Sequence, residues 1–227
     1  METSRRGDRV VRMTLLALLA AMAYLCVLFF RIPVVSFLSY EPKDVILALT
    51  GILLGPVEGV AAAAVVSLIE MVTVSGTGVW GLLMNVLASV AFLLPAAILY
   101  RMRRTLASAL IGIFMGVVIS TAMMMLWNYL ITPIYMGVPR EAVVPMLLPM
   151  FLPFNLLKDG LNAALSMLLY VPLLPALQKA RVLPNVYATA PAEGHKTAHL
   201  VLAIAVMAVI AAACVYVTWF SGWVFAG

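Results

Sequence analysis

The chain has 227 residues, of which 65% are hydrophobic and only 10% are charged, and its mean hydropathy is +1.13. Soluble domains carry roughly 25% charged residues, so the composition excludes a soluble protein and predicts an integral membrane protein. The net charge of +5 indicates membrane topology rather than nucleic-acid binding, because membrane proteins concentrate Lys and Arg in cytoplasmic loops. Both cysteines lie in apolar runs, which argues against a disulfide framework or a cysteine-ligated metal.

The N-terminal segment combines a basic start with an apolar run. Four arginines precede residues 13–30, which are uncharged and apolar. A signal peptide with Ala21 and Ala23 at its cleavage site is an alternative, but the apolar run continues past these residues. We therefore expect an uncleaved first span with the N-terminus in the cytoplasm. A polar and aromatic loop follows at residues 31–44.

Residues 45–74 are too long for one upright span. Thirty residues would extend about 45 Å, whereas the hydrocarbon core is roughly 30 Å thick. Gly55 and Pro56 lie near the middle, where they favour a turn. A double crossing also places the arginines near residue 101 on the same side as the N-terminus. We predict a helical hairpin, 45–54 and 57–74, whose first arm is too short to span upright.

The rest of the chain alternates spans and loops. We expect a glycine-rich loop at 75–81, spans at 82–100 and 106–131, and an outer loop at 132–145. In the next apolar segment, 146–177, Pro149 and Pro153 disfavour helix near the start, so the regular helix should begin near Phe154.

The predicted fold class is all-α, a polytopic membrane helix bundle. We expect a six-helix membrane domain at residues 1–181, a linker at 182–197, and an additional C-terminal transmembrane helix within 198–227. The uncharged run 198–220 has length enough to cross the bilayer. An odd number of crossings then places the C-terminus outside the cell.

The segment after Pro153 carries a polar stripe. Asn155, Lys158, Asp159 and Asn162 fall within about 100° of one another on a helix with about 100° per residue. Burying an ionisable group at bilayer depth costs a few kcal/mol, so such residues are candidates for function. The alternative is a hydrogen-bonded network between helices, with Lys158 paired to Asp159 or Glu70.

Two further amides belong to the candidate site. Asn128 lies near the end of the fifth span, at the depth expected for Asn155 and Lys158, and Asn85 lies early in the fourth span. Amides both donate and accept hydrogen bonds, so they suit a neutral heterocycle with alternating carbonyl and N–H groups, although a lone membrane Asn also serves as helix glue. Four aromatic residues are candidates for stacking on such a ring or for ordinary interfacial positions: Tyr40, Trp80, Trp127 and Tyr135.

Other features bear on partners and energy. Ala17 and Ala21 form a small-xxx-small face on the first span, which allows another helix to approach closely. No GxxxxGK[ST], HExxH or GxSxG pattern occurs, so we expect no P-loop ATP binding and no cofactor. His195 and His199 have metal-pair spacing without a third ligand, and we expect no metal site. A solute carrier of this kind would take its energy from a partner.

Several short motifs together resemble a known family. They are Tyr-Glu-Pro-Lys-Asp at 40–44, the glycine-proline turn at 51–56, Trp127-Asn128, Pro-Ile-Tyr-Met-Gly at 133–137, and Pro-Phe-Asn-Leu-Leu-Lys at 153–158. In this order and spacing they resemble the riboflavin-specific substrate-binding (S) component of energy-coupling factor (ECF) transporters. The resemblance covers residues 9–181.

This resemblance implies a six-helix subunit of the cell membrane, not an enzyme, that captures riboflavin at the outer face for ATP-driven uptake. It implies that loop 31–44 acts as a lid and that Asn128, Asn155 and Lys158 contact the flavin. Ala17 and Ala21 would dock on a transmembrane coupling protein that carries two cytoplasmic ATPases. The sequence departs from the family pattern at Asp159 and in the apolar run that begins at Ala198.

Three other functions stay open from the residues. The chain could be an S component for another vitamin, although an anionic vitamin would require more than one basic group in the site. It could be a membrane enzyme acting on a lipid, although no catalytic constellation is visible. It could also be a structural membrane subunit in which the polar stripe only holds helices together.

Overall fold

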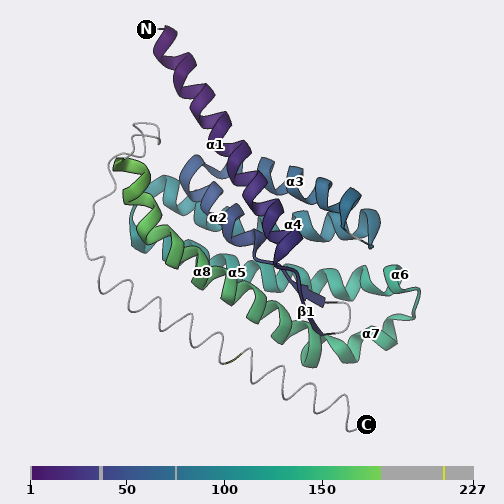
Figure 1. The fold of residues 1–227 in the computed structure, drawn as a ribbon. Helices are drawn as coiled ribbons and strands as arrows, with labels where there is room; N and C mark the ends of the chain where they lie inside the picture. Colours follow the sequence, from purple (N-terminus) through teal and green to yellow (C-terminus); the bar gives the residue numbers. More distant parts are fainter. Residues whose placement is uncertain (1, 36–37, 75, 180–211, 213–227) are drawn as a thin grey trace.

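The computed structural model describes residues 2–35, 38–74, 76–179 and 212. This part of the chain forms a helix bundle with one small β hairpin (Figure 1). The all-α prediction is therefore confirmed. The expected linker 182–197 lies outside the described residues, as does the expected C-terminal helix apart from residue 212, so the domain division stays a prediction.

The elements follow one another with short connections. In chain order they are α1 (Glu2–Phe29), β1 (Ile32–Val35), β2 (Leu38–Tyr40), α2 (Lys43–Leu54), α3 (Pro56–Thr73), α4 (Gly78–Arg103), α5 (Leu106–Leu130), α6 (Thr132–Met136), α7 (Arg140–Met146), the π-helical turn η1 (Leu147–Phe151) and α8 (Leu152–Lys179). Within the described residues, five segments are long and apolar enough to cross a membrane: Arg9–Phe29, Pro56–Thr73, Gly78–Arg103, Leu106–Leu130 and Arg140–Leu177.

The predicted helical hairpin is confirmed as α2 and α3. Gly55 separates the two helices with a φ of 126°, which L side chains rarely adopt. Pro56 then begins α3, where its missing N–H leaves no unsatisfied donor. A Cβ on Gly59 would lie 2.8 Å from the Cα of Gly51, so the absence of a side chain at Gly59 allows the two arms to approach this closely.

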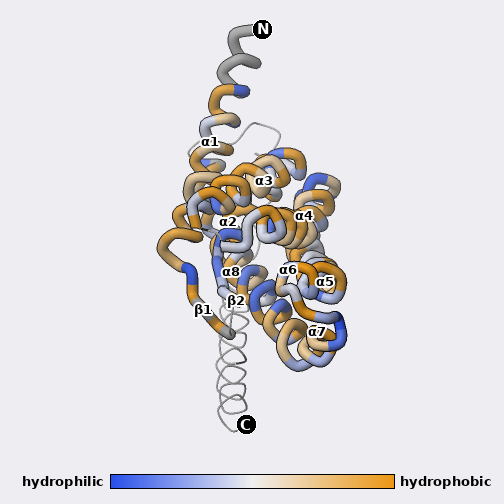
Figure 2. The backbone as a smooth tube through the Cα atoms, turned by 90° about the vertical axis from the view of Figure 1, so that its right-hand side faces the viewer, coloured by the Kyte–Doolittle hydropathy of each residue, from blue (hydrophilic) through white to orange (hydrophobic). Residues whose placement is uncertain are grey.

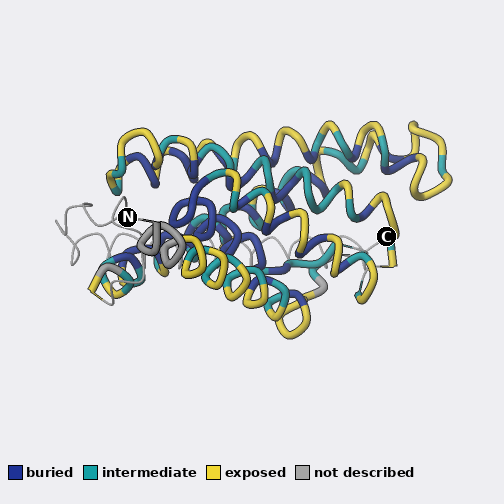
Figure 3. The backbone as a smooth tube through the Cα atoms, turned by 90° about the horizontal axis from the view of Figure 1, so that it is seen from above, coloured by how far each residue is buried: buried dark blue, intermediate teal, exposed yellow. Residues whose placement is uncertain are grey.

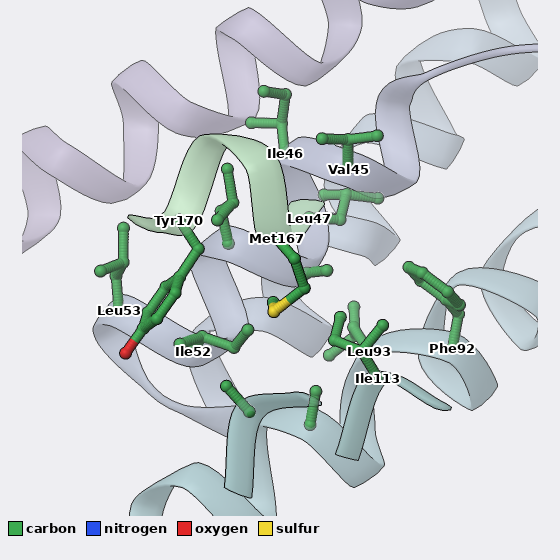
Figure 4. Packing of buried hydrophobic residues seen from close by; sticks show 14 of the residues in the cluster. Val45, Ile46, Leu47, Ile52, Leu53, Phe92, Leu93, Ile113, Met167 and Tyr170 are labelled. Atoms are coloured by element: carbon green, nitrogen blue, oxygen red, sulfur yellow. The ribbon is translucent and has the colours of Figure 1, made fainter. Parts of the chain in front are cut away.

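The short helix α2 forms the centre of the molecule. Its 12 residues extend only about 18 Å, and every one of them is buried. Figure 3 shows this buried segment enclosed by longer helices whose outer sides are exposed. In the core, Leu47 and Ile52 of α2 pack with Leu93 of α4, Ile113 of α5 and Met167 of α8 (Figure 4).

Two expected loops contain regular structure. Residues 31–44 were predicted as a loop, but β1 and β2 pair antiparallel there, with Ile32 opposite Tyr40. The expected outer loop 132–145 contains α6 and most of α7. Pro133 lies in the first turn of α6, where its fixed φ favours helix, and Gly137 ends α6 with a φ of 66°.

The proline-interrupted start of α8 takes a π-helical form. Pro149 lies within η1 and Pro153 in the first turn of α8. Proline lacks the N–H that an α-helical bond requires, and a π turn accommodates such an interruption. The prediction of a regular helix from about Phe154 was therefore correct to within two residues of the observed start at Leu152.

The bundle has two distinct ends. We call the end formed by β1, β2, α6 and α7 the hairpin end (Figure 1). The opposite end carries Arg12, which forms a 2.5 Å ion pair with Glu58, and the arginines that close α4. Figure 2 shows hydrophobic residues along most of the helices and hydrophilic residues mainly at helix ends and connections.

Candidate functional site

A cavity lies at the hairpin end, between the β hairpin and helices α3, α4, α5 and α8. The space between its side chains, including the open mouth, is about 960 Å³. Its lining residues are Arg31, Leu38, Ser39, Glu41, Glu70, Thr77, Trp80, Gly81, Met84, Asn85, Ala88, Met124, Trp127, Asn128, Ile131, Thr132, Tyr135, Phe154, Asn155 and Lys158.

Three amides from three different helices converge on this cavity. In each one the amide nitrogen donates to the protein. Asn85 Nδ2 donates to Glu70 Oε1 at 2.8 Å, whereas Asn128 and Asn155 each donate to the backbone carbonyl four residues earlier, at 2.8 and 2.7 Å. Carboxylate and carbonyl oxygens only accept hydrogen bonds. These contacts therefore fix the amide orientations. The side-chain carbonyl of Asn128 already accepts from the Thr132 hydroxyl at 2.9 Å and can accept one more hydrogen bond, while those of Asn85 and Asn155 also keep acceptor capacity.

Lys158 supplies a cation to the same cavity. Its Nζ lies 3.4 Å from Asp44 Oδ2, and only 14% of its side chain is exposed. Asp44 also accepts a 2.5 Å hydrogen bond from Ser89 through its other oxygen. The alternative of a network between helices paired Lys158 with Asp159 or Glu70, but its ion-pair partner in the structure is Asp44. The ammonium group has three donors, so it retains capacity for a ligand after bonding Asp44.

A chain of alternating charges runs beside the mouth of the cavity. Arg31 Nε lies 3.3 Å from Glu41 Oε1, and Glu41 Oε2 lies 3.3 Å from Lys43 Nζ. Lys43 also donates to Glu70 Oε2. Lys43 is thus the ion-pair partner of Glu70. The guanidinium of Arg140 lies 4.9 Å from the centre of the Tyr129 ring.

The aromatic candidates divide into two groups. Trp80, Trp127 and Tyr135 line the cavity, whereas Tyr40 does not. The Tyr40 hydroxyl donates to Asn162 Oδ1 at 3.0 Å, and burial raises the pKa of this phenol, which keeps it protonated as a donor. Its neighbours Leu38, Ser39 and Glu41 do line the cavity.

The predicted polar stripe on α8 also divides. Asn155 and Lys158 line the cavity. Asp159 and Asn162 are buried behind the lining, with 2% and 0% exposure. Asp159 lies beside the hydroxyl of Ser120 on α5, and Asn162 holds Tyr40. One half of the stripe therefore faces the cavity, and the other half joins α8 to α5 and to the hairpin.

Two carboxylates that shape the site, Asp44 and Glu41, were not among the predicted site residues. Asp44 pairs with Lys158, and Glu41 joins Arg31 to Lys43. Both belong to the motif at 40–44, where three charged residues within four positions come directly before the predominantly apolar run that begins at Val45. This clustering was the signal in the sequence that could have identified them. Charged residues that served only an exposed loop would not need to lie directly beside a segment apolar enough to be buried.

Two other predicted features have clear positions. Ala17 and Ala21 are both exposed on α1, and the buried residues Ala23 and Val27 occupy a different side of that helix. Within the described ranges, no group of three or more His, Cys, Asp and Glu side chains could hold a metal ion. His195 and His199 lie outside these ranges.

A bundle of membrane-spanning helices that presents a polar and aromatic cavity at one end belongs to the class of membrane proteins that bind a small solute. The family model described as "ECF transporter, substrate-specific component" matches residues 11–170, and the chain belongs to this family. It is therefore a multi-pass membrane transport subunit rather than an enzyme, and it associates with the ECF module of a membrane coupling protein and ATPases.

Named relatives agree with this family. The chain is 23% identical over 185 residues to the riboflavin transporter FmnP of Bacillus subtilis (strain 168), covering 76% of this chain and 97% of the relative. It is 27% identical over 167 residues to the riboflavin transporter RibU of Staphylococcus aureus (strain TCH60), covering 70% and 88%. A solved S component of a bacterial ECF transporter superposes with a TM-score of 0.62 at 27% identity, over 73% of this chain and 96% of that one.

Proposed function

We propose that this chain captures riboflavin in the cavity at the hairpin end and presents it to an ECF module for ATP-driven uptake. Convergence of Asn85, Asn128, Asn155 and Lys158 on one aromatic-walled cavity is the observation that carries the proposal. The names of two relatives, both riboflavin transporters, support the same substrate.

The donor and acceptor pattern of the cavity suits the ring system of a flavin. One edge of this ring carries an N–H between two carbonyl groups. The side-chain carbonyls of Asn128 and Asn155 would accept from the N–H, and the ammonium of Lys158 would donate to a ring carbonyl. Trp80 and Trp127 offer flat apolar surfaces for the ring face.

Charge disfavours an anionic vitamin as the substrate. Among the lining residues that the structure describes, the cations are Arg31 and Lys158, and both already have carboxylate partners. An anion would have to compete for these cations. A neutral vitamin of the wrong shape would instead leave buried amides unpaired, at about 1–3 kcal/mol for each lost partner.

The proposal includes an orientation in the membrane. The N-terminus and the end with Arg12, Arg101 and Arg103 face the cytoplasm, in accord with the distribution of Lys and Arg in membrane proteins. The hairpin end and the C-terminus then face outward. In intact cells, a membrane-impermeant thiol reagent should label Gly137→Cys and spare Met102→Cys in a chain whose native cysteines are replaced by serine. The reverse labelling would invert the orientation.

The direct test is flavin binding by the purified full chain. We expect quenching of riboflavin fluorescence on binding at a 1:1 ratio, and the bound compound should be recovered as unchanged riboflavin. Pantothenate, an anionic vitamin, serves as a competitor that should not displace it. Absence of quenching would reject riboflavin as the substrate, and recovery of a chemically altered flavin would indicate an enzyme.

A further inference from the structure

Glu70 occupies a central position between the cavity and the β hairpin. One carboxylate oxygen, Oε1, accepts from Asn85 Nδ2 at 2.8 Å, and the other, Oε2, accepts from Lys43 Nζ. The side chains of Glu70 and Lys43 are only 3% and 1% exposed. Both oxygens of this buried carboxylate are therefore committed to specific partners on different elements.

The connection through Lys43 continues to both flanks of the hairpin. Lys43 lies 3.3 Å from Glu41, which follows β2, and Glu41 lies 3.3 Å from Arg31, which precedes β1. Arg31, Glu41, Glu70 and Asn85 all line the cavity. A continuous chain of hydrogen bonds and ion pairs thus links the hairpin to one of the three amides of the site.

The carboxylate at position 70 determines how Asn85 is oriented. Because a carboxylate only accepts, Asn85 must direct its NH2 group toward Glu70, which leaves its carbonyl oxygen as the acceptor for a ligand. A glutamine at position 70 would direct its carbonyl oxygen to Lys43, which only donates, and its NH2 group to Asn85. Asn85 would then turn its own carbonyl toward residue 70 and no longer offer it to a ligand. Buried ion pairs are often no more stabilising than apolar residues of similar size, so stability alone does not account for this arrangement.

We propose that Glu70 is a positioning residue for ligand binding. It holds Asn85 in its acceptor orientation and, through Lys43 and Glu41, holds the β hairpin beside the cavity mouth. Ligand selection and retention then depend on the same carboxylate. The ligand named here rests on the proposed function, because riboflavin is the probe in the test below.

The test is a double-mutant cycle on the purified full chain, with riboflavin affinity and dissociation rate measured by fluorescence. Glu70→Gln should weaken binding about tenfold in the otherwise wild-type chain. In an Asn85→Ala background the same substitution should weaken binding at least threefold less, because residues in one hydrogen-bond network are not additive. Glu58→Gln is the matched control on the same helix, since Glu58 pairs with Arg12 at the opposite end, and it should leave affinity unchanged.

A comparison of ligands separates positioning from general damage to the fold. The probes are riboflavin, 3-methylriboflavin, which lacks the ring N–H, and lumiflavin, which lacks the hydroxylated chain. For each variant, the loss of affinity relative to wild type differs among the three flavins. Ranking the flavins by this loss should give the same order for Glu70→Gln as for Asn85→Ala. A structural defect would weaken all three equally.

If Glu70→Gln does not fold, a second double-mutant cycle, which combines Glu41→Gln with Asn85→Ala, still tests the proposal. Glu41→Gln leaves Asn85 and Glu70 in place and should accelerate riboflavin dissociation. Its effect should be smaller in the Asn85→Ala background, because Lys43 and Glu70 connect the two positions. Additive effects in the available cycle, or wild-type affinity for Glu70→Gln, would overturn the role of Glu70. Failure of the wild-type chain to bind any flavin would instead reject the proposed function.

Discussion

Helix α3 carries a glutamate near each end, and the two are treated in opposite ways. Glu58 pairs with Arg12, and these side chains are 21% and 39% exposed. Glu70 pairs with Lys43, and these are 3% and 1% exposed. An exposed pair contributes about 0–1 kcal/mol, whereas a buried pair carries a desolvation cost of several kcal/mol for each ion. The hairpin end therefore keeps buried charge where the opposite end keeps it near the surface.

The position of this buried charge coincides with the cavity. Arg31, Glu41, Glu70 and Lys158 line it, and their partners Lys43 and Asp44 lie directly behind. The core around α2, by contrast, is assembled from aliphatic and aromatic side chains. One half of the molecule is thus built for apolar packing and the other for presenting polar groups. Substitutions at matched positions in the two halves test this contrast.

The largest effect on ligand binding should come from Lys158→Ala. The substitution removes a ligand donor and leaves Asp44 without its cation, and loss of one member of a buried charge pair costs about 2–5 kcal/mol. We expect riboflavin affinity to fall about 100-fold, which corresponds to about 2.7 kcal/mol. Fluorescence quenching measures the affinity. Lys179→Ala, at the end of the same helix, should have no effect, and equal effects of the two substitutions would remove Lys158 from the site.

The second-largest effect should come from the half of the α8 stripe that faces the cavity, and the buried half should affect stability instead. Asn155→Ala removes a cavity amide and should weaken riboflavin binding more than about tenfold, since an unpaired buried group costs about 1–3 kcal/mol. Asn162→Ala removes the acceptor of Tyr40 behind the lining, so it should lower the midpoint of thermal unfolding more than it lowers affinity. If Asn162→Ala weakens binding as much as Asn155→Ala, the division of the stripe is wrong.

The sequence predicted most of what is set by local pattern. Gly55 and Pro56 marked the hairpin between α2 and α3, and helical periodicity placed Asn155 and Lys158 on one face. Periodicity does not reveal which element faces that stripe, so it did not find Asp44 as the partner of Lys158. It also placed Asp159 on the same polar face, although tertiary packing turns this residue toward α5.

The missed elements have a related cause. Strands β1 and β2 have four and three residues, too few to show a pattern of alternation. Helices α6 and α7 have five and seven residues, fewer than an isolated helix requires for stability in water. Contacts with the rest of the bundle hold such short elements, and one sequence contains no direct record of those contacts.

In the apolar half of the molecule, a substitution at Gly116 should lower stability by a smaller amount. A Cβ at Gly116 would lie 2.1 Å from the backbone oxygen of Phe92, so Gly116→Ala forces α4 and α5 apart. Overpacking of this kind costs about 1–3 kcal/mol, which should lower the thermal unfolding midpoint in detergent. Gly76→Ala, which meets no atom within 4 Å, is the matched control. An unchanged midpoint for Gly116→Ala would show that the two helices separate without cost.

The smallest effect on the cavity should come from Ala17→Trp on α1. Ala17 is exposed and does not line the cavity. Riboflavin affinity should therefore stay within about twofold of wild type, a change below about 0.5 kcal/mol. Ala17 and Ala21 present a small-residue face, and a tryptophan there would prevent close approach of another helix. We therefore expect loss of ATP-driven uptake and of co-purification with the coupling protein. Phe29→Trp, which enlarges an already large exposed residue on α1, should retain both. Normal assembly of the Ala17→Trp chain would place the docking surface elsewhere, whereas weakened binding would show that α1 and the cavity are coupled.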